Sequence, residues 1–322
     1  MSSNKKIDQW ISSRKKRLES FKADELYPLL LKGDKQALSS AITLIESTHP
    51  NARAESSKLI ELCSREKSKS WRIGITGVPG VGKSTFIEAF GSQILNAGHK
   101  LAVLAVDPSS NVTGGSILGD KTRMNTLSQE DNAFIRPTAA AGNLGGVARN
   151  SREAMLLCET AGFDVIFIET VGVGQSETMV HSMVDYFVLL LLAGAGDELQ
   201  GMKRGIMELA DTILITKADT GNEKASKLAA RAYANAVHLF PSKESNWMTN
   251  VLTTSSLDGM GLDETWDSVQ SYFNSIVSNG FYIQNRRQQN ARFLRENLTD
   301  LMLSEFDQEP EFKKYMNQLE NE

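Results

Sequence analysis

The stretch that decides the fold is Gly77-Val78-Pro79-Gly80-Val81-Gly82-Lys83-Ser84-Thr85. A short apolar run, Ile73–Ile75, precedes it, and apolar residues recur at helical spacing from Phe86 to Leu95. This order of strand, loop and helix is the context in which the pattern G-x-x-x-x-G-K-[ST] binds phosphate. The glycines let backbone amides turn inward, and the following helix adds free amides and a positive dipole. The stretch predicts a phosphate-binding loop, in which Lys83 reaches the β- and γ-phosphates and Ser84 holds Mg²⁺.

The composition is that of an ordinary globular chain, with 322 residues of which 41% are hydrophobic and 23% are charged. The net charge of −4 argues against nucleic-acid binding as the main function. Cys63 and Cys158 fit no metal-ligand spacing and no disulfide framework, which indicates a reducing compartment. The N-terminus has no signal-peptide core, and the longest apolar run, Tyr186–Ala193, is far below the roughly 20 residues of a membrane helix. We therefore expect a cytoplasmic protein without membrane contact.

The central part of the chain alternates apolar runs with helical stretches. The runs are Ile73–Ile75, Leu101–Val106, Val165–Ile168, Phe187–Leu192, Ile213–Ile215 and Val251–Leu252. This alternation predicts an α/β fold with a mostly parallel sheet, in which ligands bind at the carboxyl ends of the strands. Helical spacing before and after this part predicts a helical lead-in and a C-terminal helical arm. We divide the chain into an N-terminal helical extension (1–68), a phosphate-loop domain (69–278) and a C-terminal arm (279–322).

Acidic residues stand at the ends of two predicted strands. Asp107 follows the second run directly, and Glu169 closes the third. Carboxylates at these ends lie near the phosphate loop and are suited to bind Mg²⁺, although a helix cap or a salt bridge would also use them. Just beyond Glu169, the Gly172 amide is placed to sense a γ-phosphate, and Gln175 is a hypothetical positioner of the attacking water.

The fifth run ends in Thr216-Lys217-Ala218-Asp219. GTPases carry Asn-Lys-x-Asp at this strand end, where the aspartate accepts two hydrogen bonds from guanine and the lysine stem packs on the ring. Adenine lacks that donor pair, so the acid discriminates against it. Thr216 replaces the asparagine that braces the phosphate loop, so its hydroxyl is a partial substitute and the prediction of guanine is weakened. After the sixth run, backbone amides of the turn Thr254–Leu257 are placed to meet the guanine O6.

Two further segments, Gly114–Arg123 and Gly194–Gly205, are rich in glycine and in charges of both signs. Segments that become ordered around a nucleotide have this composition, and so do ordinary surface loops. The basic cluster Arg14–Arg17 is typical of a solvated helix face, with an anionic partner as the alternative.

Together these motifs resemble those of the methylmalonyl-CoA mutase-associated GTPases, the MeaB/ArgK-like proteins related to the human methylmalonic aciduria type A protein. The residues that carry the resemblance are Gly77–Thr85, Asp107–Ser110, Gly114–Met124, Phe134–Pro137, Glu169–Glu177 and Gly194–Gly201. The resemblance covers nearly the whole chain and is weakest before about residue 25 and after about residue 285.

The resemblance implies a homodimeric P-loop GTPase that uses Mg²⁺ and converts GTP to GDP and phosphate. It also implies a chaperone that gates adenosylcobalamin delivery to methylmalonyl-CoA mutase, or a related acyl-CoA mutase, and protects that enzyme. The implied phosphate-binding residues are Gly77–Thr85, and the magnesium candidates are Ser84, Asp107, Asp120 and Glu169. The implied base-binding residues are Lys217, Asp219, Ser255, Ser256 and Leu257. The catalytic candidates are Lys83, Glu169, Gln175 and Lys203, the last from the family's third switch segment.

Three questions stay open at the level of sequence. The pattern after Arg286 resembles the family's dimerisation arm, but a helix packed on its own domain would read the same. A small-molecule kinase uses the same phosphate loop, and Arg123, Arg136 and Arg149 are available for the lid that a kinase needs. A binding module that senses nucleotide without turning it over is the third possibility.

Overall fold

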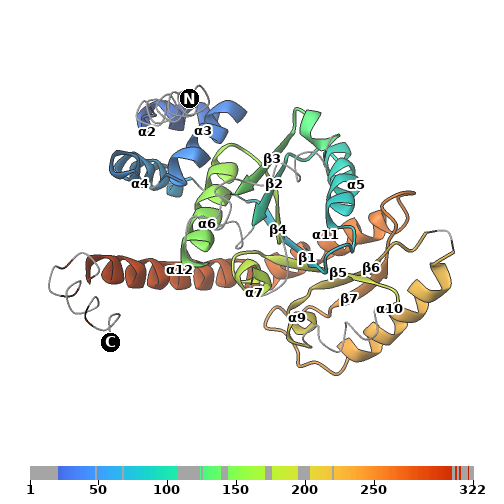
Figure 1. Ribbon diagram of the computed structural model, residues 1–322. Helices are drawn as coiled ribbons and strands as arrows, with labels where there is room; N and C mark the ends of the chain where they lie inside the picture. The colour runs from blue at the N-terminus through green and yellow to red at the C-terminus, as the bar shows by residue number, and fades with distance from the viewer. Residues whose placement is uncertain are drawn as a thin grey trace, which may run out of the picture.

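Among its described residues, the protein has one sheet of seven parallel strands in the order β3-β2-β4-β1-β5-β6-β7 (Figure 1). The strands are β1 (Trp71–Gly77), β2 (Leu101–Val106), β3 (Ala133–Thr138), β4 (Val165–Thr170), β5 (Tyr186–Leu192), β6 (Thr212–Thr216) and β7 (Asn250–Thr253). The structure is a computed structural model, and it describes residues 21–47, 49–66, 69–106, 124, 126–138, 144–170, 176–194, 204–219, 221–306, 309, 312 and 318. The predicted α/β fold with a parallel sheet is confirmed.

All the strands expected from apolar runs are present, and the sequence missed one, β3. Its sequence, Ala-Phe-Ile-Arg-Pro-Thr, has only a short apolar run and ends in a proline and a threonine. Proline removes one donor from the ladder, which a sheet tolerates at an edge strand. Since β3 pairs only with β2 in the sheet order, it is an edge strand, and the proline fits there.

Helices cover both faces of the sheet. One face packs on α5 (Lys83–Asn96) and α11 (Leu262–Ser278). The other face packs on α6 (Leu144–Thr160), α7 (Ser176–His181), α9 (Arg204–Leu209) and α10 (Glu223–Val237). The strand side chains divide between the two cores because successive residues point to opposite faces. Thus Val103 lies in the core under α5, whereas its neighbours Ala102 and Leu104 lie in the other core.

From residue 21 on, where the structure describes it, the predicted helical lead-in forms α2 (Ala23–Leu31), α3 (Lys35–Ile45) and α4 (Pro50–Ser64), which share a core with α6. Arg136 on β3 fixes them to the sheet. Its guanidinium donates to Ser39 and Thr43 of α3 and pairs with Glu46 at 2.7 Å. The basic cluster Arg14–Arg17 lies outside the described residues.

The C-terminal helix α12 (Phe281–Phe306) has two different halves. In its first half, Arg286 bonds both carboxylate oxygens of Asp185 at 2.6 Å and reaches Glu159 at 3.3 Å. In its second half, Leu294, Leu298, Leu301 and Met302 are 50–60% exposed. The helix thus begins packed on its own domain and then runs away from it (Figure 1). The apolar side of its second half is exposed.

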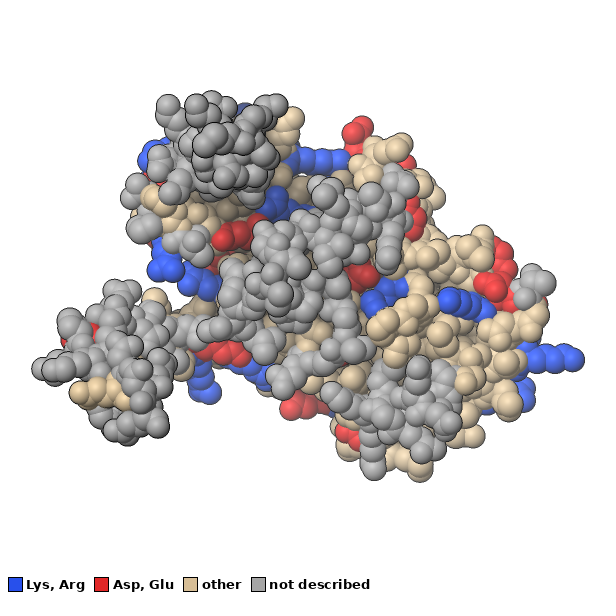
Figure 2. Space-filling view, in the orientation of Figure 1, with Lys and Arg blue, Asp and Glu red and all other residues tan. Residues whose placement is uncertain are grey.

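In the view of the surface in Figure 2, acidic and basic side chains are both scattered over the described residues. Cys63 and Cys158 are buried and free. None of the helices within the described ranges is long and apolar enough to cross a membrane.

Candidate nucleotide site

The predicted site residues gather at the carboxyl edge of the sheet. The phosphate loop follows β1, Glu169 lies near the end of β4, and the base-binding motif begins at the last residue of β6. All three strands run parallel in one sheet, so their carboxyl ends lie on the same edge. In such sheets a ligand binds where the connections from neighbouring strands leave in opposite directions, which fits the position of β1 between β4 and β5.

The phosphate loop depends on glycine at defined positions. A Cβ on Gly77 would lie 2.5 Å from the carbonyl oxygen of Leu190, so only glycine fits against β5 at the start of the loop. Gly80 and Gly82 have φ angles of 78° and 98°, which L side chains rarely adopt. Helix α5 begins at Lys83, and no side chain caps it at Gly82. Its first amides are therefore not used by a cap and are suited to bind an anion.

Lys83 lies over this loop. Its ammonium donates to the carbonyl oxygens of Gly77 at 2.7 Å and Val78 at 3.4 Å. The side chains of Lys83 and Ser84 are half-buried, whereas that of Thr85 is exposed. The Lys83 ammonium therefore contacts the phosphate loop directly, and Ser84 lies next to it in the chain.

Glu169 supplies a carboxylate beside the loop. It is 4% exposed and aligns with Ile75 of β1 on one side and with Ala105 of β2 on the other. A hydrogen bond of 2.8 Å between the hydroxyls of Thr76 and Thr170 joins the ends of the same two strands, β1 and β4. A carboxylate and a hydroxyl are oxygen donors that Mg²⁺ prefers, so Glu169 and Ser84 fit such an ion.

Thr216 connects the base-binding motif to the phosphate loop. Its hydroxyl donates to the carbonyl oxygen of Val81 at 2.8 Å and also lies 3.2 Å from that of Leu191. The side chain is buried, with 3% exposure. The hydroxyl therefore makes the bracing contact with the loop that the sequence assigned to an asparagine in this motif.

The rest of the base-binding motif is held by local hydrogen bonds. Lys217 has a φ angle of 55°, and its carbonyl accepts a bond of 2.8 Å from the Asn222 amide. The Lys217 stem lies beside Gly82, where an added Cβ would be 3.9 Å from its Cε. Asp219 accepts a bond of 3.1 Å from the Ser255 hydroxyl. The loop, the lysine stem and the aspartate are thus brought to one place.

The Ser255 hydroxyl is a contact that sequence reasoning missed. The turn was expected to contribute only backbone amides, but the Ser255 side chain also orients the Asp219 carboxylate. No local pattern signals a bond between residues 36 positions apart, so only the parallel order of β6 and β7 reveals it. Of the same turn, Leu257 is 82% exposed and Ser256 is half-buried.

Four of the predicted site residues lie outside the described part of the chain: Asp107, Asp120, Gln175 and Lys203. Among the residues that are described, no group of three or more His, Cys, Asp or Glu side chains is arranged to hold a metal ion. The magnesium role of Ser84 and Glu169 and the catalytic roles of Gln175 and Lys203 therefore stay predictions.

Two of the three arginines considered for a kinase lid have other partners. Arg136 is engaged by α3 and Glu46, as described above, and Arg149 pairs with Glu153 in its own helix at 2.8 Å. Arg123 lies outside the described residues. The described arginines therefore serve the packing of helices.

Comparison with known proteins identifies a family of GTPases, which agrees with the phosphate loop and the base-binding motif described above. The model of the family described as methylmalonyl-CoA mutase-associated GTPase MeaB matches residues 38–311. The chain belongs to this family. As the sequence predicts, it is thus a member of a family of P-loop GTPases.

Relatives of this MeaB-family chain include GTPase ArgK of Escherichia coli (strain K12), which is 46% identical over 289 residues, 90% of this chain and 87% of the relative. The mitochondrial methylmalonic aciduria type A homolog of Mus musculus is 42% identical over 307 residues, 92% of this chain and 74% of the relative. A crystal structure of an LAO/AO transport system kinase superposes with a TM-score of 0.77 at 38% identity, covering 92% of this chain and 89% of that one.

Proposed function

We propose that this chain is a Mg²⁺-dependent GTPase that acts as a chaperone for adenosylcobalamin-dependent methylmalonyl-CoA mutase or a related acyl-CoA mutase. In this role it gates delivery of the cofactor and protects the mutase through GTP hydrolysis. The observation that carries the GTPase part is the bond from Thr216 to Val81, which joins the base-binding strand end to the phosphate loop. The family description, which names the mutase, supports the partner.

In the proposed reaction, the loop amides and the amides that begin α5 bind the phosphates. The Lys83 ammonium exchanges its contact with the Gly77 carbonyl for the β- and γ-phosphates, where it offsets the charge that develops in the transition state. Mg²⁺ held by Ser84, Glu169, Asp107 and Asp120, in different nucleotide states, would neutralise phosphate charge. Gln175 positions the attacking water, and Lys203 belongs to a switch segment.

The base is held by Asp219, with the Lys217 stem on the ring and the turn at Ser255, Ser256 and Leu257 beside it. The Ser255 hydroxyl donates to one carboxylate oxygen of Asp219 and limits the orientations of that carboxylate. We assign guanine rather than adenine because the carboxylate accepts the two guanine donors and because the family is one of GTPases, despite the replacement of asparagine by Thr216.

The first test combines the loop lysine with the partner. Lys83→Ala removes the cation at the phosphates, and we expect GTP turnover to fall by a factor on the order of 10² to 10³. The measurement is phosphate release from GTP, with and without purified methylmalonyl-CoA mutase of the same organism. The wild-type chain is expected to hydrolyse GTP slowly and to change its rate when the mutase is added.

The matched control for this test is Lys100→Ala, which removes an exposed lysine directly before β2, at the amino edge of the sheet and opposite to the phosphate loop. It should retain wild-type turnover. Full activity of the Lys83 variant would refute the nucleotide site. A wild-type turnover rate that does not change when the mutase is added would refute only the proposed partnership with that mutase.

A second test addresses magnesium. Glu169→Gln keeps the shape of the side chain but replaces one anionic oxygen ligand with an amide. We expect the Mg²⁺ concentration that gives half-maximal hydrolysis to rise by roughly tenfold or more, the size expected for a weakened metal site. The measurement is a magnesium titration of GTP hydrolysis. An unchanged titration would remove Glu169 from the metal site.

We also propose a homodimer in which the second half of α12 is the dimerisation arm. The support is the apolar side formed by Leu294, Leu298, Leu301 and Met302, which is exposed in the single chain.

We propose the same division of the chain as the sequence predicts, into residues 1–68, 69–278 and 279–322. The two buried free cysteines fit a reducing, cytoplasmic setting.

The name of the LAO/AO transport system kinase keeps a phosphotransferase as the second candidate. A kinase needs an acceptor pocket near the loop and a cation that closes over the phosphates, and the described arginines Arg136 and Arg149 are held elsewhere. Transfer of labelled phosphate from GTP to an amino acid or a protein, instead of to water, would decide for that candidate.

A further inference from the structure

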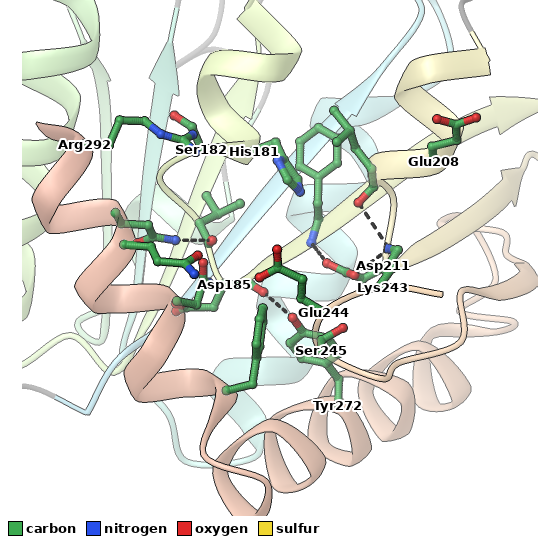
Figure 3. A pocket seen from close by; sticks show the side chains of 17 residues that line it. His181, Ser182, Asp185, Glu208, Asp211, Lys243, Glu244, Ser245, Tyr272 and Arg292 are labelled. Atoms are coloured by element: carbon green, nitrogen blue, oxygen red, sulfur yellow. Dashed lines mark hydrogen bonds and ion pairs between the residues drawn. The ribbon is translucent and has the colours of Figure 1, made fainter. Parts of the chain in front are cut away.

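Figure 3 shows a cavity of about 290 Å³. Its lining residues place it at the amino edge of the sheet, on the side opposite to the phosphate loop. Asp185 and Asp211, which line it, directly precede β5 and β6. A strand of seven residues such as β5 spans about 23 Å, so a molecule in this cavity is well beyond reach of a phosphate at the loop. The cavity is therefore separate from the nucleotide site.

Two ion pairs give the cavity a fixed wall. The Asp185 carboxylate is fully buried against Arg286 at 2.6 Å, and Lys243 pairs with Asp211 at 2.7 Å. The Lys243 ammonium also donates to the carbonyl oxygens of Leu209 and Ala210. Because these charges neutralise one another, they hold the wall in place and leave little charge for a ligand.

Two exposed charges line the cavity from different walls. Arg292 lies on α12, and Glu244 lies on the segment between α10 and β7. Neither forms a salt bridge with another residue in the described part of the chain. The carboxylate of Glu208 on α9 lines the cavity as well. Figure 3 shows Arg292 beside Ser182 at one end of the space, and the Glu244 carboxylate projecting into it below the His181 ring.

We propose that this cavity binds a small zwitterionic metabolite of amino-acid size, whose anionic group meets Arg292 and whose ammonium group meets Glu244. A cavity near 300 Å³ is at the small end of ligand pockets, which suits a metabolite of amino-acid size. A ligand with a single charge would contact only one of these two exposed groups and leave the other to water. The imidazole of His181, whose pKa is lowered by burial, adds a neutral hydrogen-bonding group.

The position of the cavity makes its ligand an effector and not an acceptor of phosphate. Helix α7 begins at Ser176, shortly after β4 ends beside Glu169, and it ends at His181 in the cavity wall. Helix α9 begins at Arg204 and ends at Leu209 in the same wall. A ligand that holds the far ends of these helices biases the positions of their beginnings, which lie toward the nucleotide edge. This coupling, unlike the binding itself, rests on the proposed function.

The test is calorimetric titration of the full chain with each of the twenty standard amino acids. Butylamine and butyrate serve as probes that carry a single charge. We expect at least one amino acid to bind with a dissociation constant below 1 mM and neither single-charge probe to do so. Arg292→Gln and Glu244→Gln are each expected to weaken that amino acid roughly tenfold, the usual loss of a hydrogen bond to a charged group.

Two matched variants control for general charge effects. Arg295→Gln on α12 and Glu264→Gln on α11 remove exposed charges that do not line the cavity, and they should bind the amino acid as the wild type does. No binding by any amino acid to a sample that binds GTP would overturn the proposal. So would binding that all four variants weaken equally.

The coupling is measured separately, as the affinity for GTP with and without the bound amino acid. We expect a change of about fivefold or more, the lower range of allosteric coupling, and its loss in Glu244→Gln. If an amino acid binds but the affinity for GTP is unchanged, the effector role is overturned, whereas the proposed binding site remains supported. A chain that binds the amino acid but no GTP would overturn the proposed function instead.

Discussion

Thr216 stands where the guanine-binding pattern has asparagine, and its hydroxyl takes over the contact with the phosphate loop. The sequence predicted that a hydroxyl would substitute only in part. The structure gives the hydroxyl two carbonyl neighbours, Val81 and Leu191, so that this one side chain ties the loop to β6 and lies near β5 as well.

This contact yields a prediction for a single atom. Thr216→Val keeps the shape of the side chain but removes the donor, leaving the buried Val81 carbonyl without this bond. We expect the free energy of unfolding to fall by about 1–3 kcal/mol and the affinity for GTP to fall with it. Urea unfolding and nucleotide titration measure the two effects.

Thr216→Ser is the matched control, since it restores the hydroxyl and loses only a methyl group. It should recover most of the GTP affinity. If the serine and valine variants bind GTP equally, the hydroxyl does not position the loop.

For individual residues, the sequence predicted the contiguous motifs and missed the contacts between residues that are distant along the chain. The residues from Gly77 to Thr85 form one uninterrupted motif, and their loop has the expected place after β1. The bonds from Thr76 to Thr170 and from Ser255 to Asp219 join residues that are 94 and 36 positions apart. Their existence depends on which strands are neighbours, and no local spacing contains that information.

Among the elements, strands buried on both faces were the easiest to predict. Strands β2, β4 and β5 are nearly uninterrupted apolar runs, as expected for the centre of a parallel sheet. The edge strand β3 was not predicted because its sequence is less apolar. An edge strand pairs with a neighbour on one side only, so its sequence can include Arg136 and a proline. Of the two alternatives for the C-terminal helix, packing on its own domain is observed for the first half of α12. The second half has exposed apolar side chains, and the dimerisation arm stays a prediction.

The bare end of α12 leads to a prediction about assembly. Leu298→Glu places a charge in the middle of the exposed apolar side, where burial in a dimer would require its desolvation. We expect the dimer to dissociate at concentrations at which the wild type is dimeric. Light scattering coupled to size exclusion gives the mass directly.

Thr299→Glu is the comparison for this variant, because it adds the same charge to the same turn on an exposed residue away from the leucines. It should remain dimeric. A wild-type chain that is monomeric at all concentrations would contradict the arm, as would a Leu298 variant of unchanged mass.

For the whole molecule, one network of charges joins segments that are distant in sequence. Glu159 of α6 binds Arg72 of β1 at 2.8 and 2.9 Å and also accepts from Arg286 of α12 and from Ser70. Burial alone would raise the pKa of Glu159, but the two arginines and the hydrogen bonds lower it to about 2. The carboxylate thus favours the folded state wherever it is ionised.

The sign of the resulting pH dependence follows from the lowered pKa. Stability from Glu159 is fully present above its ordinary pKa of 4.5 and is lost as the pH falls toward about 2. The difference corresponds to about 3 kcal/mol at 1.36 kcal/mol per pKa unit. We expect urea unfolding between pH 5 and pH 3 to show part of this loss.

Glu159→Gln should flatten this part of the pH profile and lower stability at pH 7, because Arg72 and Arg286 lose a shared anion. Glu264→Gln, an exposed carboxylate of α11, should keep the wild-type profile. An equal decline for the wild type and the Glu159 variant would show that other carboxylates govern acid unfolding. Composition and spacing gave no indication of this network, since each of its members is an ordinary charged residue in the sequence.

A Cβ added at Gly77 would be crowded, whereas one added at Gly80 would meet no described atom. Alanine substitutions at these two glycines of one motif are therefore expected to impair the protein in different ways. An alanine at the first would push β1 off the Leu190 carbonyl and damage the sheet, so lost activity there would report misfolding. At the second, no atom of the described residues lies within 4 Å of an added Cβ, and the cost there comes from the local backbone. A mutational scan that scores only hydrolysis would rank the two alike, whereas one that also scores protein abundance would separate them.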